Sequence, residues 1–183
     1  MGLLSHAGSG ANGALRTATD PTAQLRSVGD PITGLRIWGT NLAHVFPATF
    51  ERLTVGRDPT NDIVIDHETV SRRHATIEWR GPHLVVVNQG AKNATWSGGQ
   101  PQAVFQLTGG AVFRLGTVDV VATSARTEKQ RTSFQRFLGY ANHAAVDAAQ
   151  HAAEQRHHLA LIGPPGSISF ARLVHDPTPN NTW

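Results

Sequence analysis

The pattern of hydrophobic and polar positions changes along the chain and divides it into four parts. Residues 1–33 are rich in Gly, Ala, Ser and Thr without a sustained hydrophobic period, which is typical of a flexible leader. Residues 34–124 carry short β-branched and aromatic runs separated by turn-forming residues. We therefore expect a leader, an all-β domain over 34–124, a helical linker over 125–158 and a separate tail over 159–183.

About ten short strands are expected in the all-β domain. The runs are LRIW (35–38), HVF (44–46), RLTVG (52–56), IVI (63–65), HATIEWR (74–80), HLVVV (83–87), ATW (94–96), AVFQL (103–107), AVFRLG (111–116) and VDVVAT (118–123). Turns such as RGPH, WSGGQP and LTGG separate several of them, a spacing that predicts a β-sandwich. Alternation within 74–80 places Ala75, Ile77 and Trp79 on one face of their strand.

The segment after the predicted sandwich has a helical composition. TEKQRTSFQRFLG and the alanine-rich YANHAAVDAAQHAAEQRHH contain no proline and only one glycine, so we expect one or two helices as a C-terminal extension. His143 and His151 lie about two helical turns apart with Asp147 between them. A metal site would need closer ligand pairs, so we predict no metal site and interpret this stretch as a solvated helix face.

Charge and composition narrow the class of partner. The chain has 16 Lys and Arg, 13 Asp and Glu, a formal net charge of +3 and no cysteine. The absence of cysteine rules out disulfides and thiolate metal sites. The sequence has no run of basic residues and no interleaved aromatic residues, so we expect no direct nucleic-acid binding. Because we find no membrane-spanning apolar run and no convincing signal peptide, we expect a cytoplasmic protein without membrane contact.

Donor side chains gather at the ends of the predicted strands. Arg57 follows the glycine that ends one strand, and Ser71 and Arg72 precede another. Lys92 and Asn93 lie in a further loop between strands. A phosphorylated side chain carries about −1.5 to −2 charges and three acceptor oxygens, and these residue types supply the donors that such a group needs.

The same loops carry a motif combination that resembles the forkhead-associated (FHA) family. The combination is Gly56-Arg57, Asn61-Asp62-Ile63, Ser71-Arg72-Arg73-His74 and Asn93-Ala94-Thr95, and the resemblance covers roughly residues 34–124. It implies an FHA-like β-sandwich that binds phosphothreonine-containing protein segments in signalling or transcription regulation, without catalysis and without a cofactor.

Residue roles follow from the resemblance, position by position. It implies phosphate contacts from Arg57 and Ser71 and a peptide- or phosphate-contacting position for Arg72. Asn93 would hold the ligand backbone, and Lys92 would lie next to the phosphate, although an ordinary exposed lysine fits that position equally well. Structural roles are implied for Gly56 and His74.

One departure from the family pattern concerns the loop around Asn93. Ala94 stands where the family has glycine, and Asn88-Gln89-Gly90-Ala91 replaces a stretch that tends to hold Asp and Ser. If the turn requires positive φ, alanine there costs on the order of 1 kcal/mol or shifts the loop.

The tail contains a second recognisable stretch, LALIGPPGSISFARLVHD (159–176). It resembles the start of AAA+ ATPase domains, including those of bacterial enhancer-binding transcription activators. The glycine, lysine and hydroxyl positions of a P-loop are occupied by Ile168, Ser169 and Phe170, so we expect no ATP binding. We interpret the tail as a degenerate P-loop, and an unrelated turn that happens to carry GPPG is the alternative.

Two alternatives to phosphothreonine recognition stay open at this stage. The chain could be the regulatory part, or a decayed form, of an ATPase-type transcription activator. It could also be an FHA scaffold that assembles with partners without phosphate. The pairing of Arg57 with Ser71 favours the phosphothreonine-binding function over the second alternative.

Overall fold

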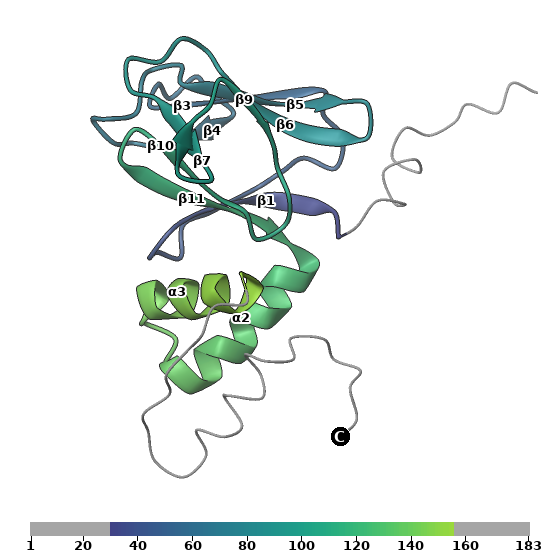
Figure 1. The fold of residues 1–183 in the computed structure, drawn as a ribbon, viewed down its shortest axis with the longest axis vertical. Helices are drawn as coiled ribbons and strands as arrows, with labels where there is room; N and C mark the ends of the chain where they lie inside the picture. The colour runs from purple at the N-terminus through teal and green to yellow at the C-terminus, as the bar shows by residue number, and fades with distance from the viewer. Residues whose placement is uncertain (1–29, 156–183) are drawn as a thin grey trace, which may run out of the picture.

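Two β-sheets and a pair of helices make up residues 30–155, which is the part of the chain that the computed structural model describes (Figure 1). One sheet has the order β2-β1-β11-β10-β7-β8 and the other β4-β3-β5-β6-β9. The strands are β1 (Ile32–Ile37), β2 (Ala43–Val45), β3 (Arg52–Gly56), β4 (Ile63–Val64), β5 (Ala75–Arg80), β6 (His83–Asn88), β7 (Thr95–Ser97), β8 (Gln100–Pro101), β9 (Val104–Gln106), β10 (Val112–Leu115) and β11 (Val118–Ser124). The helices are α2 (Ala125–Leu138) and α3 (His143–Glu154).

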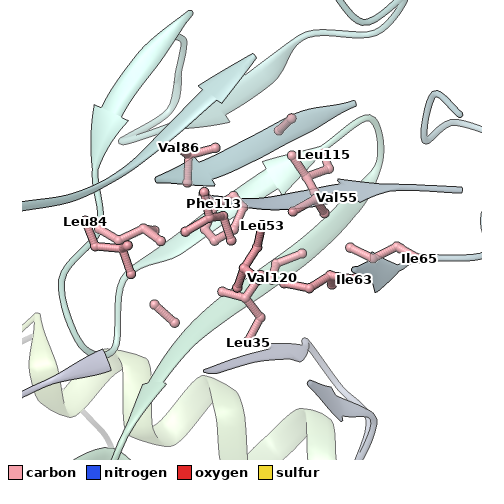
Figure 2. Packing of buried hydrophobic residues seen from close by; sticks show 14 of the residues in the cluster. Leu35, Leu53, Val55, Ile63, Ile65, Leu84, Val86, Phe113, Leu115 and Val120 are labelled. Atoms are coloured by element: carbon pink, nitrogen blue, oxygen red, sulfur yellow. The ribbon is translucent and has the colours of Figure 1, made fainter. Parts of the chain in front are cut away.

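The hydrophobic core lies between the two sheets, as Figure 2 shows. Leu53 and Ile77 reach it from the five-stranded sheet, and Leu115 and Val120 reach it from the six-stranded sheet. Ala75 and Ile77 are buried and Trp79 packs against the same cluster, so the alternation predicted for β5 is correct. The prediction of an all-β sandwich with a helical extension is confirmed.

Most observed strands differ from the predicted runs by one or two residues at their ends, and two differences are larger. β1 begins at Ile32, two residues before the predicted start of the domain, because its first residues pair with the end of β11. β8 occupies Gln100–Pro101 within the stretch predicted as a turn. It is a two-residue edge strand with a proline, which leaves no hydrophobic alternation in the sequence to reveal it. Residues 1–29 of the predicted leader and the predicted tail at 159–183 lie outside the described residues.

The helix pair begins where β11 ends. Ser124 is the last residue of β11 and also caps α2, because its Oγ accepts from the Thr127 N–H at 3.2 Å. The Thr127 hydroxyl accepts from the Ser124 N–H at 2.8 Å, which completes a capping box. Phe134 on α2 and Val146 on α3 are fully buried against each other's helices. In Figure 1 the pair lies beneath β1 and β11.

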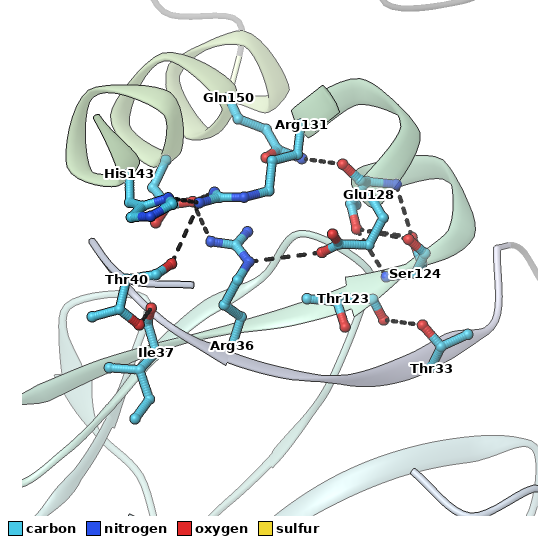
Figure 3. Close-up of polar contacts among 12 residues, drawn as sticks. Thr33, Arg36, Ile37, Thr40, Thr123, Ser124, Glu128, Arg131, His143 and Gln150 are labelled. Atoms are coloured by element: carbon cyan, nitrogen blue, oxygen red, sulfur yellow. Dashed lines mark hydrogen bonds and ion pairs between the residues drawn. The ribbon is translucent and has the colours of Figure 1, made fainter. Parts of the chain in front are cut away.

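A buried polar network joins this helix pair to the sandwich (Figure 3). Arg36 on β1 and Arg131 on α2 both donate to the same carboxylate oxygen of Asp147 on α3. The other oxygen of Asp147 accepts from the Gly39 N–H at 2.8 Å. Arg36 and Arg131 are each 3% exposed and Asp147 is 2% exposed.

The prediction of a solvated face around Asp147 is therefore wrong. The face of α3 that carries Asp147 packs on α2 and on the outer side of β1, and His143 lies 3.2 Å from the Arg131 guanidinium. The sequence pattern did not predict the burial of Asp147, because an aspartate on a helix is usually exposed. Its burial depends on the two arginines that pair with it, Arg36 and Arg131. Within residues 30–155, no helix has the length and apolarity that crossing a membrane requires.

Candidate phosphate-binding loops

Gly56 lets two loops approach each other closely. It ends β3, and the Arg57 N–H that follows it donates to the Ser71 carbonyl at 3.0 Å. The Asp58 N–H donates to the Arg72 carbonyl at 3.1 Å. A Cβ at position 56 would lie 2.3 Å from that Arg72 oxygen, so no other residue fits there without moving the loop. The glycine therefore brings the predicted phosphate-binding residues Arg57 and Ser71 side by side at the main chain.

The buried side chain of Asn61 stabilises the contact between the loops of Arg57 and Ser71. It is 8% exposed, and its side-chain amide donates to the carbonyls of Asp58 and Arg72, both at 2.7 Å. The neighbouring Asp62 accepts from the N–H and the hydroxyl of Thr54, each at 2.7 Å. These bonds hold the pKa of Asp62 below its ordinary value. The Asn-Asp pair of the motif thus ties its loop to both flanking segments.

His74 supports the serine from below. It is fully buried, and its Nδ1 accepts from the Ser71 N–H at 3.1 Å. An accepting Nδ1 means that the proton of the neutral ring is on Nε2. Burial lowers the pKa of His74, which keeps the ring neutral at pH 7. The residue lies beneath the loop surface and shapes it without facing solvent.

The Ser71 hydroxyl is oriented by a third loop. Its Oγ accepts from the Lys92 N–H at 3.1 Å, a bond that uses a lone pair and leaves the hydroxyl proton available. The loop of Lys92 is itself shaped by Asn88, whose Oδ1 accepts from the N–H groups of Gly90 and Ala91 at 2.7 and 3.0 Å. Asn88 therefore organises the stretch in which the sequence departs from the family pattern.

Asn93 is exposed and held at one end. Its Nδ2 donates to the carbonyl of Thr69 at 2.7 Å. The second N–H and the Oδ1 of the amide remain for a ligand. Thr69 is a site residue that the sequence analysis missed, because its contribution is a backbone carbonyl and carries no signal in the residue type.

The surface over these loops is rich in positively charged side chains. Arg57, Arg72, Arg73 and Lys92 are all exposed. The acidic neighbour Asp58 is engaged, since its Oδ1 accepts from the N–H and hydroxyl of Thr60 at 3.0 and 2.7 Å. Those bonds, with smaller contributions from the charges of Arg72 and Arg73, lower its pKa. The arrangement suits an anion with several acceptor oxygens.

Metal binding has no support in the described part of the chain. Residues 30–155 contain no group of three or more His, Cys, Asp and Glu side chains that could hold a metal ion. The degenerate P-loop predicted at 159–176 is not among the described residues.

Comparison with known proteins finds matches to the sandwich. Residues 53–116 match the family model of the FHA domain. The oxoglutarate dehydrogenase inhibitor of Corynebacterium jeikeium is 32% identical over 90 residues, which are 49% of this chain and 62% of that protein. The glycogen accumulation regulator GarA of Mycolicibacterium smegmatis is 32% identical over 83 residues, 45% of this chain and 52% of its own. The chain thus spans roughly half to three fifths of these relatives.

Solved structures of similar domains are also found. One comes from a study of phosphothreonine-dependent FHA domain interactions, with 24% identity, a TM-score of 0.45, and coverage of 49% of this chain and 93% of the other. Another is EmbR of Mycobacterium tuberculosis in complex with a low-affinity phosphopeptide, with 22% identity, a TM-score of 0.46, and coverage of 51% and 24%.

Proposed function

Because the β-sandwich is an FHA domain, a member of a family of phosphothreonine-binding signalling modules, we propose that this chain binds a phosphothreonine-containing segment of a partner protein. The observation that carries the proposal is the main-chain bond from the Arg57 N–H to the Ser71 carbonyl, which makes neighbours of the two residues expected to contact the phosphate.

Each donor has a distinct part in this proposal. The guanidinium of Arg57 offers a fixed, permanently charged fork to the phosphate oxygens. The Ser71 hydroxyl donates its proton, since its lone pair already accepts from the Lys92 N–H. Arg72 and the Lys92 ammonium add positive charge around the phosphate. Asn93 holds the main chain of the ligand through its Oδ1 and its second N–H.

The names of the relatives support a regulatory role without catalysis. One is an inhibitor of oxoglutarate dehydrogenase and the other a regulator of glycogen accumulation. By analogy, we infer that this chain acts by binding a protein and altering its activity. Relatives with names from central metabolism also support the expected cytoplasmic location.

The proposal is tested with an oriented phosphothreonine peptide library and the unphosphorylated library as control. We expect selection of phosphorylated peptides only. Losing a charge-assisted bond costs roughly 1.5–3 kcal/mol, so Arg57→Ala weakens binding of a selected peptide by about tenfold to a hundredfold. Arg80→Ala is the matched control, because Arg80 is an exposed arginine at the far end of β5 that pairs with Glu78 at 2.8 Å. Equal binding of unphosphorylated peptides would instead support a phosphate-independent scaffold.

A further inference from the structure

Thr69 joins three loops that are far apart in the sequence. It lies between β4 and β5, and its carbonyl accepts from Asn93 in the loop between β6 and β7. Its hydroxyl accepts from the Thr117 N–H at 3.0 Å, in the turn between β10 and β11. The sequence motif does not include Thr69 or this turn.

The hydrogen bonds of the Thr69 hydroxyl form a directed chain. The Thr69 N–H donates to His67 Nδ1 at 3.3 Å, so that nitrogen is an acceptor. The Thr69 hydroxyl lies 2.9 Å from the same nitrogen and therefore donates to it. The Thr117 hydroxyl, 2.9 Å from Thr69 Oγ1, then donates to Thr69. The Thr69 hydroxyl thereby donates one hydrogen bond, to His67, and accepts two, both from Thr117.

Gly116 allows the turn between β10 and β11 to pack closely against Thr69. A Cβ at position 116 would lie 2.3 Å from the Thr69 carbonyl oxygen, and the glycine has φ +64°. Its N–H points back to the Ala94 carbonyl at 3.4 Å, next to Asn93. The β10–β11 turn therefore contacts Thr69 directly and contacts Ala94, the residue that follows Asn93.

We propose that Thr69 is a positioning residue for ligand binding: its hydroxyl ties it to the β10–β11 turn, and its carbonyl thereby fixes the orientation of the Asn93 amide. This inference rests on the proposed function. An Asn side chain otherwise rotates about two bonds, and each free rotor that a ligand must immobilise weakens binding. With one N–H held by Thr69, the Oδ1 and the other N–H are set for the ligand main chain before it arrives.

The test is Thr69→Val, which keeps the shape of the side chain and removes the hydroxyl. The probe is a phosphothreonine peptide chosen from the library with the wild-type protein. We expect Thr69→Val to weaken its binding by about three- to tenfold, while Thr69→Ser, which retains the hydroxyl, stays within about twofold. Thr40→Val is the matched control, since the Thr40 hydroxyl also makes two bonds in a turn, to Ile37 and Leu42.

A second readout needs no ligand. The side-chain amide signals of Asn93 in an NMR spectrum report its bond to Thr69. We expect their chemical shifts to change in Thr69→Val and to stay at the wild-type values in Thr69→Ser. Thr117→Val, at an exposed position, removes one bond of the same chain and is expected to shift them in the same direction. This variant serves if Thr69→Val does not fold.

The outcomes separate the two proposals. If Thr69→Val binds the peptide like wild type while Arg57→Ala does not, Thr69 has no positioning role and the proposed function stands. If wild type selects no phosphopeptide, the proposed function fails. The unliganded Asn93 signals then decide about Thr69: unchanged signals in Thr69→Val overturn the inference.

Discussion

Arg36 and Asp147 form a buried ion pair although 111 positions separate them in the sequence. One lies on the first strand of the sandwich and the other on the last helix of the described residues. Arg131 donates to the same carboxylate oxygen, and Glu128, which is half exposed, lies 3.7 Å from Arg36 (Figure 3). One buried carboxylate thus serves two buried guanidinium groups.

Asp147→Asn is expected to destabilise the protein strongly. The substitution leaves Arg131 without its carboxylate partner and Arg36 with only the half-exposed Glu128, and breaking a buried pair on one side costs about 3–5 kcal/mol. The free energy of unfolding from urea titration measures this. Asp119→Asn is the control, since Asp119 pairs with Arg114 at 2.7 Å on the surface and such pairs contribute up to about 1 kcal/mol. Equal losses in both variants would contradict the network.

Gly56→Ala is expected to weaken phosphopeptide binding and to lower stability. The added Cβ meets the Arg72 carbonyl at 2.3 Å, so the loop with Ser71 must move away from Arg57. We expect a loss of at least tenfold in affinity, measured by calorimetry. Gly81→Ala separates this clash from backbone strain, because Gly81 lies in the turn between β5 and β6, has φ +60° with nothing within 4 Å, and its replacement costs only on the order of 1 kcal/mol. Affinity close to wild type in Gly56→Ala would refute the packing argument.

The stability of the protein should fall below pH 6.5 through His74. Burial lowers the pKa of His74 in the folded state from its ordinary value of 6.5. The unfolded state therefore binds more protons in this range, and the free energy of unfolding decreases as pH falls from 6.5 towards the folded pKa. Protonation of the folded ring, which sets in only near its lowered pKa, would also place a donor opposite the Ser71 N–H, so phosphopeptide binding should weaken only at that lower pH.

NMR titration of the histidine rings checks this prediction. We expect the His74 signals to remain those of the neutral ring below pH 6.5. A His74 ring that charges at pH 6.5 or above would be inconsistent with its burial as the cause.

The tail at 159–183 should not bind ATP. The positions that supply the lysine and the metal-binding hydroxyl in a P-loop hold Ser169 and Phe170. Calorimetric titration of the full chain with ATP and Mg²⁺ is expected to show no binding. Ser169→Lys alone should not restore it, because Ile168 puts a side chain where a glycine lets the backbone approach the phosphates. Micromolar affinity that is lost on removal of residues 159–183 would revive the ATPase alternative.

Local sequence patterns predicted the fold, but they did not predict contacts between residues that are far apart in the sequence. The alternation in β5 and the bounds of β3 follow from residue type alone, and the motif singled out Arg57 and Ser71 as neighbours. The burial of Asp147 depends on Arg36, which no local period connects to it. The contribution of Thr69 is a carbonyl that only the folded loops bring to Asn93. Sequence patterns therefore named the donors together with Gly56 and His74 that support them, and missed Thr69 and Asp147, whose contacts come from distant segments.

Ser124 has a further consequence as the residue shared by β11 and α2. Its N–H donates to Thr127, and its hydroxyl accepts from the Thr127 N–H while donating to Asp30, so the strand passes directly into the capped helix. With Asp147 fastening α3 to β1, the end of α3 cannot swing independently of the sandwich. The position and direction of the α3 end at Glu154 are therefore set by the sandwich through the buried pair of Arg36 and Asp147.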